Sequence, residues 1–416
     1  MAAIAPRAAS SPGREVPGCP LAGSGLRHRL ALRTEVGRVG ATGVTRLLPT
    51  YRGSGRARHS SGVTLLLPRL SGVRGRAPSR ARPCRRLFDT DMRLYAATGD
   101  AIACLDEGDF RWSLTLTVEG SGAQCLAVDP RDGDVLYVGL RSNGVRKSSD
   151  GGATWIDCEL PAREVFSLAV SPADGAVYAG CEPSALFKSN DGGRTWSELD
   201  SLLELPSRTK WRFPPRPWTS HVRWIAPSPH DADRLLVGIE LGGLIRSTDG
   251  GVTWQDHRPG AQRDVHSLAW HPRVPGRAYE AGGGGAAWSS DGGDTWQPAD
   301  EGRDRHYTWS VAVDPVDPDR WYLSASTGPM AAHRGGDPEA QIYSRQSGGL
   351  WEQVTGGLPD PLPAMPYALV TTGARVFAGL SDGQVWESSD RGETWRSLEI
   401  VGTPVGSLVA LAAAER

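Results

Sequence analysis

Short runs of alternating apolar and polar residues, each five or six residues long, recur along most of this chain. SLAVSP (Ser167–Pro172) followed by AVYAG (Ala176–Gly180) is one example. The first run of this pair recurs with little change in CLAVDP at 125–130, SLAWHP at 267–272 and SVAVDP at 310–315. Because these runs alternate and end at Pro, Gly or Asp, they predict short β-strands. The repeating unit consists of an inner strand, a second strand, a third strand that leads into a recurring turn, and a fourth strand that follows the turn.

That turn is the octapeptide Ser-x-Asp-x-Gly-x-Thr-Trp. Its intact copies occupy residues 148–155, 189–196, 247–254, 289–296 and 388–395, with a worn copy at 344–351 and a fainter one at 104–112. The central positions recur at intervals of 41 to 58 residues. With strand-like flanks, a period near 40 to 50 is typical of propeller blades.

The octapeptide has the chemistry of a hairpin turn. Asp is expected to accept hydrogen bonds from backbone N–H groups two residues on, Gly supplies a positive φ, and the Ser and Thr hydroxyls tie the two arms together. Trp covers the hairpin with a large apolar surface. A catalytic Asp is needed once, whereas a turn Asp is needed in every blade. We therefore assign a structural role to Asp150, Asp191, Asp249, Asp291 and Asp390, and to Trp155, Trp196, Trp254, Trp296, Trp351 and Trp395.

On these motifs the chain resembles the Asp-box, or BNR-repeat, β-propellers, a group that includes sialidases, xyloglucan hydrolases, sortilin-type receptors and the photosystem II assembly factor. The resemblance extends from Met92 to about Ala410. It implies the fold and leaves the function open, because these relatives include enzymes, receptors and assembly factors. The nearest kind of relative is the uncharacterised bacterial propeller with WD40-, YVTN- or BNR-like repeats.

The ends of the repeat predict a closed ring. RLYAATG (Arg93–Gly99) reads as a second strand without an inner strand before it, and GSLVALA (Gly406–Ala412) reads as an inner strand with nothing after it. Together they complete a seventh blade and leave no long strand edge exposed. We predict an all-β protein in which residues 92–416 form a single closed seven-bladed propeller.

Residues 1–91 have a different composition. They contain 17 Arg, no Lys and four acidic residues, for a net charge of +13, whereas the remainder carries −14. This Arg-, Gly-, Pro- and Ser-rich segment predicts a disordered extension. Three interpretations stay open: a transit peptide, a basic tail for nucleic acid, and an over-extended start with Met92 as the true first residue. We favour the third because the composition changes abruptly there.

Compartment and partners follow from what the sequence contains. No secretory signal or 18-residue apolar stretch is visible, and the six cysteines show no paired spacing. We expect a cytoplasmic monomer that needs no cofactor. An acidic propeller argues against binding of nucleic acid by the folded domain, and we expect no membrane association. The expected partner is a glycan, peptide or protein ligand.

Departures from the repeat locate a candidate site. Two insertions, Asp200–Ser220 and Thr327–Glu339, are expected on the face opposite the octapeptides, and all seven histidines after Met92 lie within the fourth to sixth blades. Insertions and polar residues that replace apolar ones in a repeat are typical of binding sites on a rigid scaffold. We predict an axial pocket lined by Arg223, Glu240, Asp264, His266, Tyr307 and Trp309, with Trp211 and Arg334 at its rim.

Three functions fit such a pocket. We favour a ligand- or protein-binding scaffold. The alternative is a sialidase-like or other exo-glycosidase, for which Glu240 and Asp264 are the one carboxylate pair that we nominate as catalytic. The Phe/Tyr-Arg-Ile-Pro motif of sialidases is not found near residues 92–104, and RFPP (Arg212–Pro215) lies in the wrong blade. The third candidate is a divalent-metal site at Asp264 and His266 with His221 or His306, although no ligand-spacing motif supports it.

Overall fold

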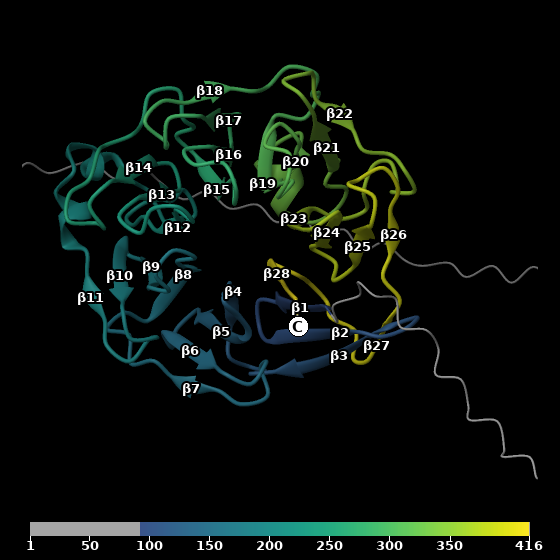
Figure 1. Ribbon diagram of the computed structural model, residues 1–416, viewed down its shortest axis with the longest axis horizontal. Helices are drawn as coiled ribbons and strands as arrows, with labels where there is room; N and C mark the ends of the chain where they lie inside the picture. The colour runs from purple at the N-terminus through teal and green to yellow at the C-terminus, as the bar shows by residue number, and fades with distance from the viewer. Residues whose placement is uncertain (1–91, 416) are drawn as a thin grey trace, which may run out of the picture. The chain divides into compact units, whose positions relative to one another are not determined.

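The computed structural model describes residues 92–415, which form seven antiparallel sheets arranged as the blades of a β-propeller (Figure 1). The predicted disordered segment 1–91 lies outside the described residues. Blade 1 contains β1 (Met92–Ala97), β2 (Ile102–Glu107), β3 (Trp112–Thr117), β27 (Ile400–Val401) and β28 (Ala410–Glu415). Blade 2 contains β4 (Ala123–Asp129), β5 (Asp132–Leu140), β6 (Val145–Ser148) and β7 (Ile156–Asp157). Blade 3 contains β8 (Glu164–Val170), β9 (Val177–Glu182), β10 (Ala185–Ser189) and β11 (Ser197–Glu198).

The remaining blades repeat this order from the axis outward. Blade 4 contains β12 (Val222–Pro227), β13 (Leu235–Ile239) and β14 (Gly243–Ser247). Blade 5 contains β15 (Val265–Trp270), β16 (Ala278–Gly282), β17 (Gly285–Ser289) and β18 (Gln297–Pro298). Blade 6 contains β19 (Tyr307–Val313), β20 (Trp321–Ser326), β21 (Gln341–Arg345) and β22 (Glu352–Gln353). Blade 7 contains β23 (Pro366–Thr372), β24 (Arg375–Leu380), β25 (Val385–Ser388) and β26 (Arg396–Ser397).

Blade 1 joins strands from both ends of the described chain. β28 pairs with β1 in antiparallel register from Met92↔Glu415 to Ala97↔Ala410. The predicted pairing is therefore confirmed, but the strand begins at Ala410 and extends to Glu415, later than the expected 406–412. A further strand that the repeat did not predict, β27, adds to the outer edge of β3 in parallel.

The octapeptides form turns between the third and fourth strands. In the first copy, Asp150 accepts hydrogen bonds from the backbone N–H of Thr154 at 2.8 Å and from its hydroxyl at 2.5 Å. Ser148 Oγ accepts from the N–H of Gly152 at 2.8 Å. The same bonds recur around Asp191, Asp249, Asp291 and Asp390. The N–H partner lies four residues after the Asp rather than two, because the turn makes a wider loop than a simple Asx turn.

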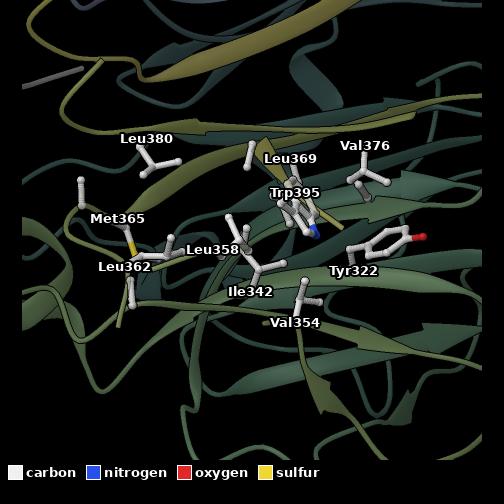
Figure 2. Close-up of a cluster of buried hydrophobic side chains, with 14 of the residues drawn as sticks. Tyr322, Ile342, Val354, Leu358, Leu362, Met365, Leu369, Val376, Leu380 and Trp395 are labelled. Carbon is white, nitrogen blue, oxygen red and sulfur yellow. The ribbon is translucent and has the colours of Figure 1, made fainter. Parts of the chain in front are cut away.

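The apolar core lies between neighbouring blades. Figure 2 shows the cluster between blades 6 and 7, where Tyr322, Ile342 and Leu369 pack with Trp395 from an octapeptide turn. Burying each such side chain contributes about 1.5–3 kcal/mol. Tyrosines on the second strands also connect blades, because their hydroxyls donate to carbonyls of the following blade: Tyr95 to Gly133, Tyr279 to Pro318 and Tyr322 to Arg391.

Both insertions interrupt this regular pattern, and Ser201 of the first one donates to the carbonyl of Gly251 in an octapeptide turn at 3.2 Å. The crossing from blade 3 to blade 4 contains two 3-10 helices, η1 (Asp200–Glu204) and η2 (Pro206–Lys210). The loop between β20 and β21 contains α1 (Pro329–His333), the one α-helix among residues 92–415. Within that described range, no helix has the length and hydropathy needed to span a bilayer.

Candidate functional site

The six predicted pocket residues come from three neighbouring blades. Arg223 lies on β12, Glu240 follows β13, Asp264 and His266 stand at the start of β15, and Tyr307 and Trp309 lie on β19. Because successive strands of a blade run antiparallel, an inner strand begins where the second strand ends. These positions therefore lie at the same end of their blades, opposite the octapeptide turns. β12, β15 and β19 are the inner strands of blades 4 to 6 (Figure 1).

We call the region formed by Arg223, Glu240, Asp264, His266, Tyr307 and Trp309 the axial mouth. Aromatic rings form one of its walls. The His266 ring centroid lies 4.5 Å from Trp309 and 4.9 Å from Tyr307. On the other side of Trp309, His333 lies at 4.5 Å and Tyr367 at 5.5 Å. The guanidinium of Arg223 lies over the Trp309 ring at 4.6 Å from its centroid, a cation–π geometry.

His333 and Tyr367, which the sequence interpretation did not select, contact the predicted residue Trp309. His333 bridges two hydroxyls, with Nε2 2.8 Å from Tyr307 Oη and Nδ1 2.9 Å from Tyr367 Oη. Burial and the nearby His266 and Arg223 lower the pKa of His333 to about 4, so the ring is neutral at pH 7. Its neighbour Arg334, the predicted rim residue, is exposed.

Glu240 belongs to a line of charged groups. Its Oε2 lies 2.9 Å from His221 Nε2 and 3.8 Å from Arg223 Nε. Burial acts to raise the pKa of Glu240, but the hydrogen bond with His221 and the charge of Arg223 outweigh it and hold the pKa at about 2. On its other nitrogen, His221 Nδ1 lies 3.3 Å from Glu182 Oε2. Glu240 is therefore ionised at neutral pH.

Asp264 and His266 are fixed by the backbone around them. His266 Nδ1 lies 2.6 Å from the carbonyl oxygen of Thr308, and since a carbonyl only accepts, Nδ1 carries the proton. Nε2 then faces Asp264 Oδ2 at 3.4 Å. A Cβ at Gly283 would lie 2.1 Å from the same Asp264 oxygen, so a larger residue there would displace the Asp264 carboxylate.

Several buried polar atoms of this mouth have no hydrogen-bond partner among the described residues. They are Nε of Arg223, Oδ1 of Asp264 and Nε2 of His266. Nδ1 of His221 also makes no hydrogen bond, but it faces Glu182 Oε2 at 3.3 Å. Most buried polar atoms in proteins are hydrogen-bonded, and unpaired ones are costly. Their concentration at one axial mouth is typical of a site where a ligand supplies the missing partners.

Two cavities adjoin these residues. The first, of about 360 Å³, lies along the axis and is lined by inner strands, with Arg223, Trp309 and Tyr367 among its lining residues. The second, of about 340 Å³, lies beside the blade 3 to blade 4 insertion and is lined by Glu164, Glu182, Pro183, Arg208, Trp211, Arg216, Trp218, Thr219 and Ser220.

Trp211, the other predicted rim residue, is only 7 % exposed and packs against Val222 and Ile239, while its indole N–H donates to Ser207 Oγ at 2.9 Å. It contributes a wall of the second cavity rather than an exposed edge of the first. Its role at the rim stays a prediction.

A buried carboxyl that the sequence interpretation missed is Glu280 on β16. Its Oε2 accepts the backbone N–H of Gln262 at 2.9 Å, while Oε1 has no partner among the described residues. Burial raises the pKa of Glu280 to about 8, against the opposing hydrogen bond from Gln262. Because its side chain is fully enclosed, Glu280 does not face a ligand.

The residues proposed for a metal ion do not form a coordination sphere. Among residues 92–415, no group of three or more His, Cys, Asp or Glu side chains is placed to hold a metal ion. His306 is exposed, and His221 is engaged with Glu240 and Glu182.

Comparisons with known proteins support the fold. No protein-family model matches the chain, and no curated protein matches it significantly in sequence. Among solved structures, the GH74 xyloglucanase from Xanthomonas campestris has a TM-score of 0.57 at 18% identity, over 78% of this chain and 52% of that chain. An ancestral GH74 enzyme has a TM-score of 0.52 at 18% identity, over 77% and 39%. YCF48 from Cyanidioschyzon merolae has a TM-score of 0.48 at 14% identity, over 69% and 86%.

The chain spans about half the length of the xyloglucanase and less of the ancestral enzyme. At such low identity the similarity to these GH74 enzymes shows a shared β-propeller fold alone.

Proposed function

We propose that this protein is a binding scaffold that takes a peptide, glycan or protein ligand at the axial mouth of blades 4 to 6. The observation that carries the proposal is the group of three buried polar atoms without a hydrogen bond, on Arg223, Asp264 and His266, beside an aromatic wall. A mostly apolar cavity with a few convergent polar groups is the usual form of a ligand site. The repeated octapeptide supports placing the scaffold among Asp-box propellers.

The mouth suits binding because its polar groups are held in place before any ligand arrives. The Thr308 carbonyl orients His266, and Trp309 supports the Arg223 guanidinium. A ligand that meets fixed partners loses less of its binding free energy to ordering the protein. The mouth offers hydrogen-bond donors and acceptors beside a wall of aromatic rings. We therefore expect a ligand with polar groups on one side and a flat surface on the other.

A second candidate function, glycoside hydrolysis, is favoured by one observation. Glu240 is held ionised at the mouth, as a nucleophile or base of a glycosidase must be. Such an enzyme also needs a protonated carboxyl that contacts the glycosidic oxygen. The carboxyl with a raised pKa is Glu280, which is enclosed, so Asp264 would have to take this role.

One experiment tests both candidates. The full chain is applied to arrays of glycans and peptides, beside Trp309→Ala, Arg223→Gln and the control Phe110→Ala, whose ring is 93 % exposed outside the mouth. We expect bound ligands to be retained by the control and weakened roughly tenfold or more by both mouth variants, provided that each unfolds at the wild-type temperature. Ligands that bind both mouth variants as tightly as wild type would contradict the proposal.

Hydrolysis of the same glycans is followed in parallel with Glu240→Gln and Asp264→Asn. Turnover that both substitutions abolish would favour the enzyme. Binding without turnover would leave the scaffold as the function.

A further inference from the structure

The second cavity, beside the blade 3 to blade 4 insertion, is a built site that the proposed function does not use. It differs from the axial cavity in its lining. One of its lining residues, Glu182, lies 3.3 Å from Nδ1 of the enclosed His221, whose Nε2 lies 2.9 Å from Glu240.

Arg216 organises the polar side of this cavity. Its two terminal nitrogens contact the two oxygens of Glu164 at 3.0 and 3.1 Å, and one of them also contacts Glu182 at 2.6 Å. The guanidinium lies 5.8 Å from the centroid of the Phe166 ring and 5.7 Å from that of Phe213. Because two carboxylates and two rings hold the guanidinium in place, the donors of Arg216 and the acceptors of Glu164 and Glu182 stand in fixed positions.

The charges of the cavity balance. Glu164 and Glu182 carry two negative charges, and Arg208 and Arg216 carry two positive ones. A ligand with a net charge gains little from such a lining, whereas a neutral ligand with many hydroxyls finds a charged acceptor or donor for each. The polar chemistry of the cavity therefore favours a neutral polyol.

The apolar side of the cavity supplies flat surfaces. Trp211 forms a buried wall, and Trp218 lines the same cavity while remaining 79 % exposed. Trp218 therefore presents an accessible indole face to a ligand in the cavity. An indole face packs well against the C–H face of a flat ring but forms no hydrogen bonds with hydroxyls. The carboxylates and guanidinium groups of the same cavity can form those hydrogen bonds.

We propose that this second cavity is a carbohydrate subsite that holds one sugar ring, with the ring face on Trp218 and its hydroxyls on Glu164 and Arg216. A pyranose combines the two required properties, a ring of C–H faces and a rim of hydroxyls, and a cavity of about 340 Å³ accommodates it. The subsite shares no lining residue with the axial cavity.

The test uses the full chain with the methyl glycosides of glucose, galactose, mannose and xylose as probes. Binding is measured by calorimetry at millimolar sugar, with sorbitol, which has hydroxyls but no ring face, as the ligand control. We expect at least one glycoside to bind and sorbitol to bind at least about tenfold more weakly, because stacking on an indole contributes much of the affinity.

Substitutions of the lining residues test where the sugar binds. Trp218→Ala should weaken the binding roughly tenfold or more, Trp218→Phe should restore part of it because a flat ring returns, and Glu164→Gln should weaken it by loss of a charged acceptor. Trp218 is exposed, so its replacement leaves the core unchanged. Phe110→Ala, on an exposed ring elsewhere, should bind as wild type.

Trp309→Ala separates this proposal from the proposed function, because it alters the axial mouth alone. Sugar binding that persists in Trp309→Ala and disappears in Trp218→Ala supports the subsite. Absence of binding by all four glycosides, or binding that Trp218→Ala leaves unchanged, would overturn it. A peptide that binds through Trp218 while the sugars do not would also overturn it.

Discussion

At the scale of the residue, this propeller separates its carboxyl groups by environment. Glu240 meets His221 and Arg223 and stays ionised, whereas Glu280 is surrounded by the core of blades 4 and 5 and receives one backbone hydrogen bond. The sequence showed why Glu240 stands out, since Leu140, Cys181 and Leu380 occupy its place in other blades. Glu280 lies inside the apolar strand AYEAG, and a single acidic residue in a strand does not reveal which side faces the core.

Glu280 should make stability fall as the pH rises. Its folded-state pKa is raised from 4.5 to about 8, because burial favours the neutral carboxyl. The contribution of Glu280 to the free energy of unfolding is therefore fully present below pH 4.5 and is lost as the pH rises through 8. The free energy of unfolding should fall by up to about 1.4 kcal/mol per pH unit in this window, and Glu280→Gln should remove that slope. Urea titrations from pH 5 to 9 measure it, with exposed Glu119→Gln as the control. Parallel curves for Glu280→Gln and wild type would show that the carboxyl is not buried as described.

At the scale of the element, the octapeptide turn is the unit that the sequence predicted best. Its residues repeat and form the same bonds in each intact copy, so local chemistry alone specifies the turn. The insertions are different, because no repeat constrains them. From PMAAHRGGD the sequence suggested Arg334, yet His333 contacts the site, since the short helix α1 directs neighbouring side chains apart.

Acid should weaken these turns. Hydrogen bonds from the Thr154 hydroxyl and N–H and from Ser148 lower the pKa of Asp150 from 3.8 to about 2. A lowered folded-state pKa stabilises the fold above 3.8, and this contribution is lost as the pH falls toward 2. Asp150→Asn should reduce the loss of melting temperature between pH 4 and 2, while exposed Asp109→Asn should not. Both variants should keep any ligand binding, and loss of binding in folded Asp150→Asn would contradict the structural role of the turn.

At the scale of the whole molecule, the fold was predictable and the site only partly. Seven blades follow from the repeat. Comparing equivalent positions selected six residues of blades 4 to 6 that contact one another in pairs, and their role as a pocket stays a prediction. Tyr367 was missed because β23 lacks the SLAV-like pattern of the other inner strands, so its register could not be read. Glu182 was missed because its partners, Arg216 and His221, come from residues 34 and 39 positions away.

The ring should depend on its last strand. Deleting residues 406–416 removes β28, which occupies the inner position of blade 1 and pairs with every residue of β1. Without it, Leu94 and Ala96 lose their cover, and β1 presents an unpaired edge. We expect the deletion to abolish cooperative thermal unfolding, whereas a chain ending at Glu415 should unfold as wild type. A deletion variant with a single sharp transition at the wild-type temperature would show that β28 is dispensable.

The pairing of β28 with β1 also sets an order of events during synthesis on the ribosome. Once a nascent chain has exposed β1 to β3, which end at Thr117, these three strands of blade 1 wait until synthesis reaches β28 at Ala410 for their inner neighbour. During elongation at about 5–20 residues per second, that edge stays open for tens of seconds. Until β28 leaves the exit tunnel, the growing protein therefore presents this edge to other chains as a template for aggregation.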